Sequence, residues 1–530
     1  MQYVLSYDIG TTGLKSCLIE IGDSVRLIDG EYETYGLYIL DNGGAEQDCD
    51  EWWNAMCKST KRLIAKTGLP PKNVSGISFC SQMQGLVLVD KDGNALRRPM
   101  SYMDQRGGDV MKEAEQYGIT VSGVNLRILL KSLIATHAAS TSVKDPLWKY
   151  KWVQKNEPEI FEKVYKWLDV KEYLICRLTG ECVMTPDSAY STFLYDTRKG
   201  KEGFSRALCK MYGVRYEHMP RIVGCSEVVG GLRKKEASEL GLIEGIPVYG
   251  SGGDATLIGI GAGATGLGDT HIYCGTSGWV GTVIDRQEVD IVSMIAGIVG
   301  AQKGRFNYFA EMETAGKCFE WVKDHLALDE IDIYLNKVDV GYSEEKKYES
   351  LYDYLSEVIS KVEPGSGGVI FTPWLHGNRC PFEDPKAAGM FFNIGLETGK
   401  SQLLRAVIEG ICFHMRWMLE SQDKKIKTSE KIRFVGGGAL SSVTCQILSD
   451  IIGREVDTVD YTKDVGAIGA AMLVAAGSGQ IKDLSLVKEQ IRPCGCYKPN
   501  LENKGVYDRQ YEVFKRLYKS NAKNFAALND

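Results

Sequence analysis

Residues 3–19 are YVLSYDIGTTGLKSCLI, a sequence that predicts an apolar strand, a Gly-Thr-Thr-Gly turn and a second apolar strand. Residues 272–284, IYCGTSGWVGTVI, repeat this plan with Gly-Thr-Ser-Gly at the turn. Glycines let such a turn present backbone N–H groups to an anion, and threonine hydroxyls add donors that suit phosphate oxygens. Each turn alone could be an ordinary hairpin, but two of them could hold one triphosphate from both sides.

The repeated unit divides the chain into two related halves. Strand and helix patterns alternate along the chain, which is typical of an α/β fold. A chain of 530 residues is also long enough for more than one domain. We therefore predict two domains, over residues 1–254 and 255–530, each with one of the turns. A polar segment follows the first hairpin, and a helix is predicted after it over residues 50–65.

The composition excludes several functional classes. Hydrophobic residues make up 44% and charged residues 25% of the chain, close to the averages for soluble globular proteins. The net charge of −6 argues against nucleic acid as the main partner, because such a surface repels polyanions. We expect no membrane association, because no apolar run approaches the roughly 20 residues that span a bilayer. The fifteen scattered cysteines indicate reduced thiols and a cytoplasmic location.

Two aspartates lie at positions where they could bind a metal ion or accept a proton. Asp8 ends the first strand beside the glycine turn, where a carboxylate can reach a Mg²⁺ carried by bound phosphates. Asp254 follows Gly250-Ser251-Gly252-Gly253 and is predicted to lie in a loop that ligands can reach. A carboxylate there could accept the proton of an acceptor hydroxyl during phosphoryl transfer. An aspartate that only stabilises a turn is the competing interpretation.

Further glycine-rich segments raise the question of nucleotide binding. Gly436-Gly437-Gly438 lies between a predicted strand and a predicted helix, where a flat ring could rest on the backbone, although a tight crossover is equally compatible. Residues 261–266, GAGATG, match the dinucleotide fingerprint GxGxxG, but a strand rather than a helix is predicted after them. The chain contains no GxxxxGK[ST] loop, so a P-loop kinase is disfavoured.

Along nearly all of its length the chain resembles the FGGY carbohydrate kinases. No single motif is specific, but the motifs occur together and in the family's order. They are DIGTTGLK at 8–15, GGAEQDCDEWW at 43–53, SQMQGLVLVD at 81–90, KNEPEIF at 155–161, GSGGDA at 250–255, CGTSG at 274–278, TAGKCFEW at 314–321, RCPFEDPKAAGMFF at 379–392, LLRAVIEG at 403–410, GGGA at 436–439 and DVGAIGAAML at 464–473.

The resemblance implies two actin-like (ribonuclease H-like) domains with ATP and a sugar in the cleft between them. It implies that Asp254 is the general base, that Asp8 holds Mg²⁺, and that the sugar lies on the N-terminal side. The residues implied at ATP are Thr11, Thr12, Lys15, Gly275, Thr276, Gly316, Gly436, Gly437 and Gly438, and those implied at the sugar are Met83, Gln84, Tyr102, Asp104 and Asp254.

The acceptor predicted from this resemblance is D-xylulose. Residues 81–90 are most similar to the xylulokinases of the family, whose matching segment contains Gln-Met-His-Gly. Gln84 stands where that histidine is expected, Ala255 where those enzymes have Asn, and Tyr102 where Trp is common. These departures fall near the implied sugar site and none falls at ATP. Another ketose, a polyol or a sugar acid therefore stays open as the acceptor.

Other classes of protein remain as alternatives. An actin-like regulatory ATPase would turn over no sugar, and the intact Gly-Gly-Asp254 segment argues against it. An NAD-dependent oxidoreductase would need the GxGxxG segment in a strand–helix context. The expected ligands are thus ATP, Mg²⁺ and a small sugar, and the sequence leaves a homodimer open.

Overall fold

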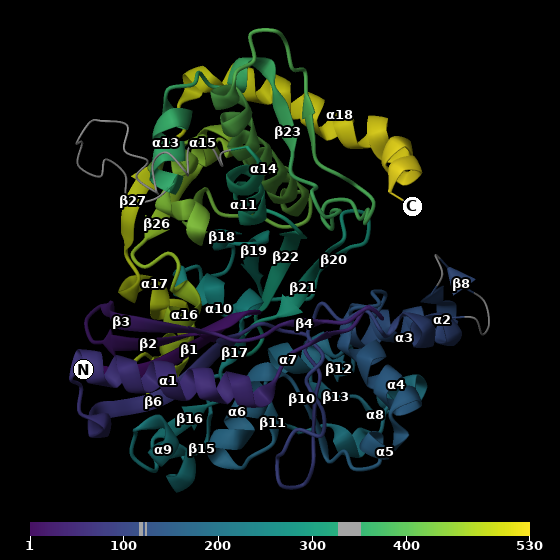
Figure 1. The fold of residues 1–530 in the computed structure, drawn as a ribbon, viewed down its shortest axis with the longest axis vertical. Helices are drawn as coiled ribbons and strands as arrows, with labels where there is room; N and C mark the ends of the chain where they lie inside the picture. The colour runs from purple at the N-terminus through teal and green to yellow at the C-terminus, as the bar shows by residue number, and fades with distance from the viewer. Residues whose placement is uncertain (116–119, 122–123, 327–350, 530) are drawn as a thin grey trace.

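The computed structural model describes residues 1–115, 120–121, 124–326 and 351–529. Two large sheets form the centres of two bodies (Figure 1), with most of the first half of the chain in the lower body and most of the second half in the upper one. No helix among the residues described is long and apolar enough to cross a membrane.

The first sheet is built around the N-terminal hairpin. β1 pairs antiparallel with β2, and on its other side it runs parallel to β6. The side-chain register places Asp8 opposite Lys15 across the hairpin. The strand order is β15 (Val228–Gly231), β16 (Pro247–Tyr249), β6 (Val74–Ser81), β1 (Gln2–Ile9), β2 (Gly13–Ile21) and β3 (Val25–Thr34), and β17 (Gly252–Gly253) also pairs with β6.

The second sheet has the same plan. β18 and β19 form its hairpin, and β18 runs parallel to β25 on its other side. This confirms the repeated unit that the two turn sequences predict. The order is β20 (Val289–Asp290), β21 (Ile295–Val299), β22 (Phe306–Met312), β19 (Gly278–Ile284), β18 (Thr270–Cys274), β25 (Lys431–Val435), β26 (Glu455–Val459) and β27 (Pro493–Tyr497).

Helices cover both sheets. In the first half they are α1 (Cys49–Thr67), α2 (Gly108–Glu115), α3 (Leu126–Thr136), α4 (Pro146–Asn156), α5 (Pro158–Phe161), α6 (Val170–Thr179), α7 (Pro186–Ser191), α8 (Arg206–Tyr212) and α9 (Lys234–Leu240). In the second half they are α10 (Asp254–Gly261), α11 (Gly316–His325), α13 (Leu351–Ser360), α14 (Lys400–Asp423), α15 (Ser442–Ile452), α16 (Val465–Gly477), α17 (Val487–Gln490) and α18 (Lys504–Leu528).

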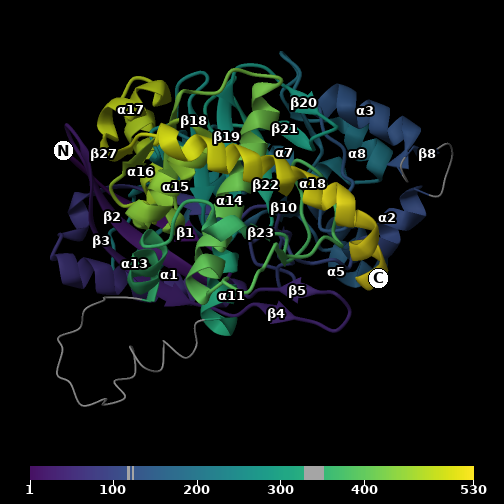
Figure 2. The same ribbon diagram turned by 90° about the horizontal axis from the view of Figure 1, so that it is seen from above.

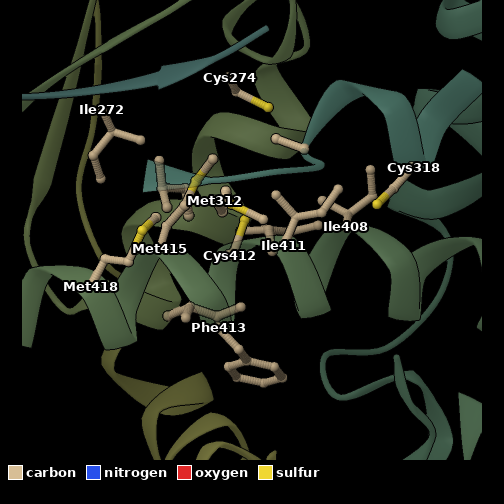
Figure 3. Close-up of a cluster of buried hydrophobic side chains, with 14 of the residues drawn as sticks. Ile272, Cys274, Met312, Cys318, Ile408, Ile411, Cys412, Phe413, Met415 and Met418 are labelled. Carbon is tan, nitrogen blue, oxygen red and sulfur yellow. The ribbon is translucent and has the colours of Figure 1, made fainter. Parts of the chain in front are cut away.

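The core of the upper body lies on both sides of α14. Figure 3 shows Ile411, Cys412 and Met415 of this helix on the side that faces the second sheet, whereas Phe413 points the opposite way. The Phe413 ring lies 5.7 Å from the ring of Phe514 on α18, measured between centroids. Figure 2 shows α18 crossing over α14 and α15. The apolar stripe of the C-terminal helix is therefore core packing.

Two apolar helices, α10 and α16, lie between the two bodies (Figure 1). They share one core with residues of β1 and β2, such as Val4 and Ile19. The helices pack without a gap because glycines face each other: a Cβ at Gly469 would overlap the carbonyl oxygen of Leu257. This packing ties the first sheet to the second half of the chain. The division at residues 254 and 255 itself stays a prediction.

Several local predictions are confirmed, one strand was not predicted, and one prediction is wrong. The helix predicted over 50–65 is α1, and GAGATG at 261–266 begins at the last residue of α10 and precedes β18, so it lacks the dinucleotide context. The segment predicted to be polar contains β3, an edge strand without a fully buried side chain and hence with a weak apolar pattern. Asp254 lies not in a loop but at the first position of α10.

Candidate active site

Each of the two Gly-Thr turns closes on itself by a hydrogen bond from its first glycine. In the first, the N–H of Gly10 donates to the carbonyl oxygen of Gly13 over 2.9 Å. In the second, the N–H of Gly275 donates to the carbonyl oxygen of Ser277 over 3.0 Å. The residues Thr12 and Thr276 are exposed at the two tips. Both turns can therefore offer a hydroxyl to a phosphate without breaking the fold.

Thr11 links the first turn to a residue implied at the sugar. Its hydroxyl donates to the Tyr102 hydroxyl over 3.3 Å, and its carbonyl oxygen accepts from Nε2 of Gln47 over 2.6 Å. The Tyr102 side of the site thus adjoins the turn predicted to bind phosphate. Gln47 is a support that the sequence reasoning did not single out.

Asp8 lies beside a cation and a second carboxylate. Nζ of Lys15 donates to Oδ1 of Asp464, the residue that precedes α16, over 2.7 Å. Desolvation raises the pKa of Asp8 to about 6, with Lys15 opposing the shift and Asp464 adding to it. Because α16 comes from the second half, the Lys15–Asp464 pair joins the two halves next to Asp8.

The second turn is tied to the start of α11 and to the glycine run. The N–H of Gly316 donates to the carbonyl oxygen of Gly275 over 2.7 Å. Gly436 has a positive φ of 93°, and a Cβ there would lie 2.6 Å from the carbonyl oxygen of Cys274. A Cβ at Gly437 would meet only that oxygen, at 3.9 Å. The structure therefore brings together the residues predicted at ATP in the second half.

Asp254 is a second carboxylate of the site with a raised pKa. Its Oδ1 accepts from the N–H of Ala255 over 2.7 Å. Desolvation raises its pKa to about 7; the hydrogen bond from Ala255 opposes the shift, and the negative charges of Asp8 and Glu311 add to it. A carboxylate with a pKa near neutrality is suited to accept a proton at physiological pH.

A buried network behind Asp254 was missed by the sequence reasoning. Oδ2 of Asp187 accepts from the N–H of Gly253 over 2.7 Å and from the Thr256 hydroxyl over 2.9 Å, which anchors the start of α10. Lys171 supports the same region by donating to the hydroxyls of Thr185, over 2.7 Å, and Ser188. Thr-Pro-Asp marks the start of α7 in sequence, but nothing there indicates a partner at Gly253.

An acidic group from β22 was also missed. Oε2 of Glu311 accepts from Nη1 of Arg379 over 3.0 Å. The charges of Asp254, Glu311 and Glu313 all contribute to raising the pKa of Tyr102, after its desolvation. The site is therefore rich in carboxylates, and its arginine is already paired.

The residues implied at the sugar fall into two groups. Met83 packs directly on Gly253, since a Cβ at that glycine would overlap its thioether. Gln84 has a positive φ of 65°, and its carbonyl oxygen accepts from Lys149. Asp104 is fully buried, and its Oδ2 accepts from Nη2 of Arg106 over 2.7 Å. Met83 and Tyr102 thus lie by Asp254, whereas the Asp104 carboxylate is directed at an arginine.

The shared plan of the two sheets, with a turn on each and Asp254 between them, defines a two-domain phosphotransferase of the actin-like, ribonuclease H-like class. The chain belongs to the FGGY family of carbohydrate kinases: the family's N-terminal domain matches residues 3–261 and its C-terminal domain matches residues 271–478. The predicted fold class and the predicted sugar-kinase activity are thereby confirmed.

Relatives with two different acceptors are similar to the chain. It is 27% identical over 521 residues to the xylulose kinase of Bacillus subtilis (strain 168), covering 98% of this chain and 97% of that protein. It is 26% identical over 531 residues to the gluconokinase of the same organism, covering 97% and 95%. The fold matches a ligand-bound xylulose kinase from Lactobacillus acidophilus with a TM-score of 0.85, at 23% identity, over 99% of this chain and 100% of that one.

Proposed function

We propose that this carbohydrate kinase transfers the γ-phosphoryl group of ATP to a hydroxyl of D-xylulose. One observation carries the proposal: Asp254, whose pKa is raised to about 7, stands at the start of α10 beside Met83, with Asp8 and Glu311 close enough to perturb it. A carboxylate held in this protonation range between two donor turns fits the base of a phosphoryl transfer.

In this proposal the two turns bind the triphosphate from opposite sides. Thr11, Thr12 and Lys15 serve the first turn, and Gly275 and Thr276 serve the second. The support is that each turn closes on itself by one hydrogen bond and that Thr12 and Thr276 are exposed at the tips. The carbonyl oxygens of these two threonines are held from behind, by the N–H of Tyr35 at Thr12 and by the N–H groups of Ala315 and Lys317 at Thr276. Gly316, Gly436, Gly437 and Gly438 border the adenosine, where the open surface at Gly437 suits a flat ring.

The site fits a Mg²⁺ that arrives with ATP. Among the described residues no cluster of three or more His, Cys, Asp or Glu could hold a metal by itself. Mg²⁺ usually keeps several waters and binds through one or two carboxylates plus substrate phosphates. Asp8 is the carboxylate that would hold it, and the bound ion would supply positive charge against the phosphate oxygens.

Proton transfer is assigned to Asp254. Its ionised carboxylate takes the proton of the acceptor hydroxyl, the hydroxyl oxygen bonds to the γ-phosphorus, and the bond from that phosphorus to the leaving oxygen of ADP breaks. The raised pKa makes Asp254 a stronger base than an ordinary aspartate, provided that it is ionised. Closure of the two bodies would exclude water and so limit wasteful hydrolysis of ATP.

A neutral ketose is favoured over a sugar acid by the charges around Asp254. The residues Asp8, Glu311 and Glu313 are acidic, and Arg379 is already engaged by Glu311. A substrate carboxylate would meet like charges, which costs binding free energy. The similarity to xylulose kinases also supports D-xylulose. Gluconate remains the second candidate because the gluconokinase of Bacillus subtilis is nearly as similar.

A coupled assay of ADP release tests the proposal directly. The acceptors compared are D-xylulose, other ketopentoses, polyols and gluconate, each with ATP and Mg²⁺. We expect the highest kcat/KM with D-xylulose. A higher value with gluconate would replace D-xylulose by a sugar acid. Absence of stimulation by any acceptor would favour a regulatory ATPase.

A further inference from the structure

The peptide group between Gln84 and Gly85 is hydrogen-bonded at its C=O and at its N–H to buried charged side chains. Nζ of Lys149, on α4, donates to the carbonyl oxygen of Gln84 over 2.7 Å. Oδ1 of Asp169, the residue before α6, accepts from the N–H of Gly85 over 2.9 Å. An ammonium and a carboxylate from two separate elements therefore hold one peptide unit, and we call this pair the peptide clamp.

The clamp is costly to bury. Lys149 has no exposed surface and Asp169 is only 4% exposed. Removing each charge from water is unfavourable unless hydrogen bonds compensate for it. Desolvation lowers the pKa of Lys149 to about 8 and raises that of Asp169 to about 7. Each of the two charged groups is hydrogen-bonded to the peptide of Gln84 and Gly85, so the peptide and the clamp depend on each other.

The backbone at Gln84 is strained, and the space around the neighbouring Gly85 is tight. Gln84 has a φ of 65°, in the left-handed region, which is unfavourable for a residue with a Cβ. A Cβ at Gly85 would lie only 2.6 Å from Oδ1 of Asp169, so a larger residue would push the clamp apart. Strain of this kind persists only where surrounding groups impose it, and it is concentrated at functional sites.

We propose that Lys149 and Asp169 are positioning residues that orient Gln84 and thereby set the affinity for the acceptor sugar. The inference rests on the proposed function, in which Gln84 lies at the acceptor. Lys149 cannot touch the acceptor itself, because its side chain is fully buried. It acts through the peptide, whose orientation decides where the Gln84 side chain projects.

The first test replaces Lys149 with Met, which keeps the length of the side chain and removes its charge and donors. We expect the KM for the acceptor to rise by at least about tenfold, because misplacing a positioning group costs substrate interactions. The KM for ATP should stay within about twofold, since the clamp does not reach the turns. Lys151→Met is the matched control: on the same helix, Nζ of Lys151 donates instead to Gln154 over 2.5 Å.

A double-mutant cycle separates positioning from general support of the fold. If Lys149 acts through Gln84, adding Lys149→Met to a Gln84→Ala background should change the acceptor KM by no more than about threefold, because coupled residues are non-additive. An equal effect of Lys149→Met in both backgrounds would overturn the proposal. So would an unchanged acceptor KM in the single variant.

A second pair of variants covers the case in which Lys149→Met does not fold, as judged by thermal unfolding. Asp169→Ala removes the acceptor for the N–H of Gly85, whereas Asp169→Asn keeps an oxygen there. The Ala variant should raise the acceptor KM by about tenfold, and the Asn variant should restore it to within about threefold. Equal KM values in the wild type and the Ala variant would refute the clamp. A wild-type protein without acceptor-dependent ADP release would instead refute the proposed function.

Discussion

Among individual residues, Asp254 has both the position and the raised pKa that a catalytic base requires. It begins α10, and desolvation together with Asp8 and Glu311 raises its pKa to about 7. Asp187 anchors the backbone in front of it through the N–H of Gly253. The position of the proposed base is therefore fixed by a hydrogen bond to a separate element, α7.

Asp254→Asn should keep ATP binding and lose turnover. The amide is nearly isosteric with the carboxylate but cannot accept the proton, and a positioned base contributes roughly 10²–10⁴-fold. Steady-state kcat and calorimetric ATP affinity check both halves of the statement. Retention of more than about a tenth of the wild-type kcat would rule out Asp254 as the base.

The same assignment predicts how activity depends on pH. Only ionised Asp254 can take a proton, so kcat/KM for the acceptor should fall as the pH drops below about 7, the value to which the pKa is raised. Bound Mg²⁺ would move this decline to lower pH, because positive charge favours the ionised form. A rate that rises towards acid pH would contradict the assignment.

Gln84→His should preserve or improve the use of D-xylulose. An imidazole and an amide can each both donate and accept a hydrogen bond, so both can satisfy a sugar hydroxyl. The KM for ATP should not change. The measurement compares kcat/KM for D-xylulose in the two proteins. If D-xylulose is inert with both, the acceptor assignment fails and only the sugar-kinase activity stands.

At the scale of structural elements, the two hairpin turns belong to different sheets. Thr11 belongs to the first turn and Thr276 to the second, and the tip residues Thr12 and Thr276 are exposed. Gly316 at the start of α11 supports the second turn through its N–H. The two turns are separate in sequence and can act together only across the interface of the bodies.

Thr11→Val and Thr276→Val test whether both turns bind one triphosphate. Each change removes a hydroxyl donor and keeps the shape of the side chain. ATP affinity should fall by about fivefold or more in each variant, as expected for one lost hydrogen bond of about 1 kcal/mol. Sugar affinity should change much less. Calorimetry that finds unchanged ATP affinity in both variants would exclude the two-turn arrangement.

For the molecule as a whole, the contact between α10 and α16 joins the two bodies. These helices share a core with β1 and β2 and contain glycines at their closest approach. Lys15 and Asp464 add an ion pair between β2 and the start of α16. The two bodies are thus joined through a packed apolar layer directly beside the candidate site.

Gly469→Ala should destabilise the whole protein. The new methyl group would overlap the Leu257 carbonyl oxygen, and overpacking typically costs about 1–3 kcal/mol. Gly505→Ala on α18 is the matched control, since a Cβ there meets nothing within 4 Å. The control should be neutral or slightly stabilising, because Ala favours a helix. Thermal unfolding compares the two, and equal midpoints would contradict this packing.

Local patterns were enough to predict the repeated strand-turn-strand units and α1. Strand alternation, glycine turns and helical spacing are properties of neighbouring residues, so they can be recognised in one dimension. The resemblance carried by ordered motifs led from there to the family and its activity. The edge strand β3 was not predicted, because none of its side chains is fully buried and its apolar pattern is therefore weak.

Only the folded chain revealed what surrounds the candidate residues. Asp187 meets Gly253, Lys149 meets Gln84, and Arg379 meets Glu311, each pair more than sixty positions apart in sequence. Such contacts depend on how distant elements pack, and no local pattern specifies them. The same packing desolvates Asp254, because the pKa of a carboxylate responds to all charges and surfaces near it in space.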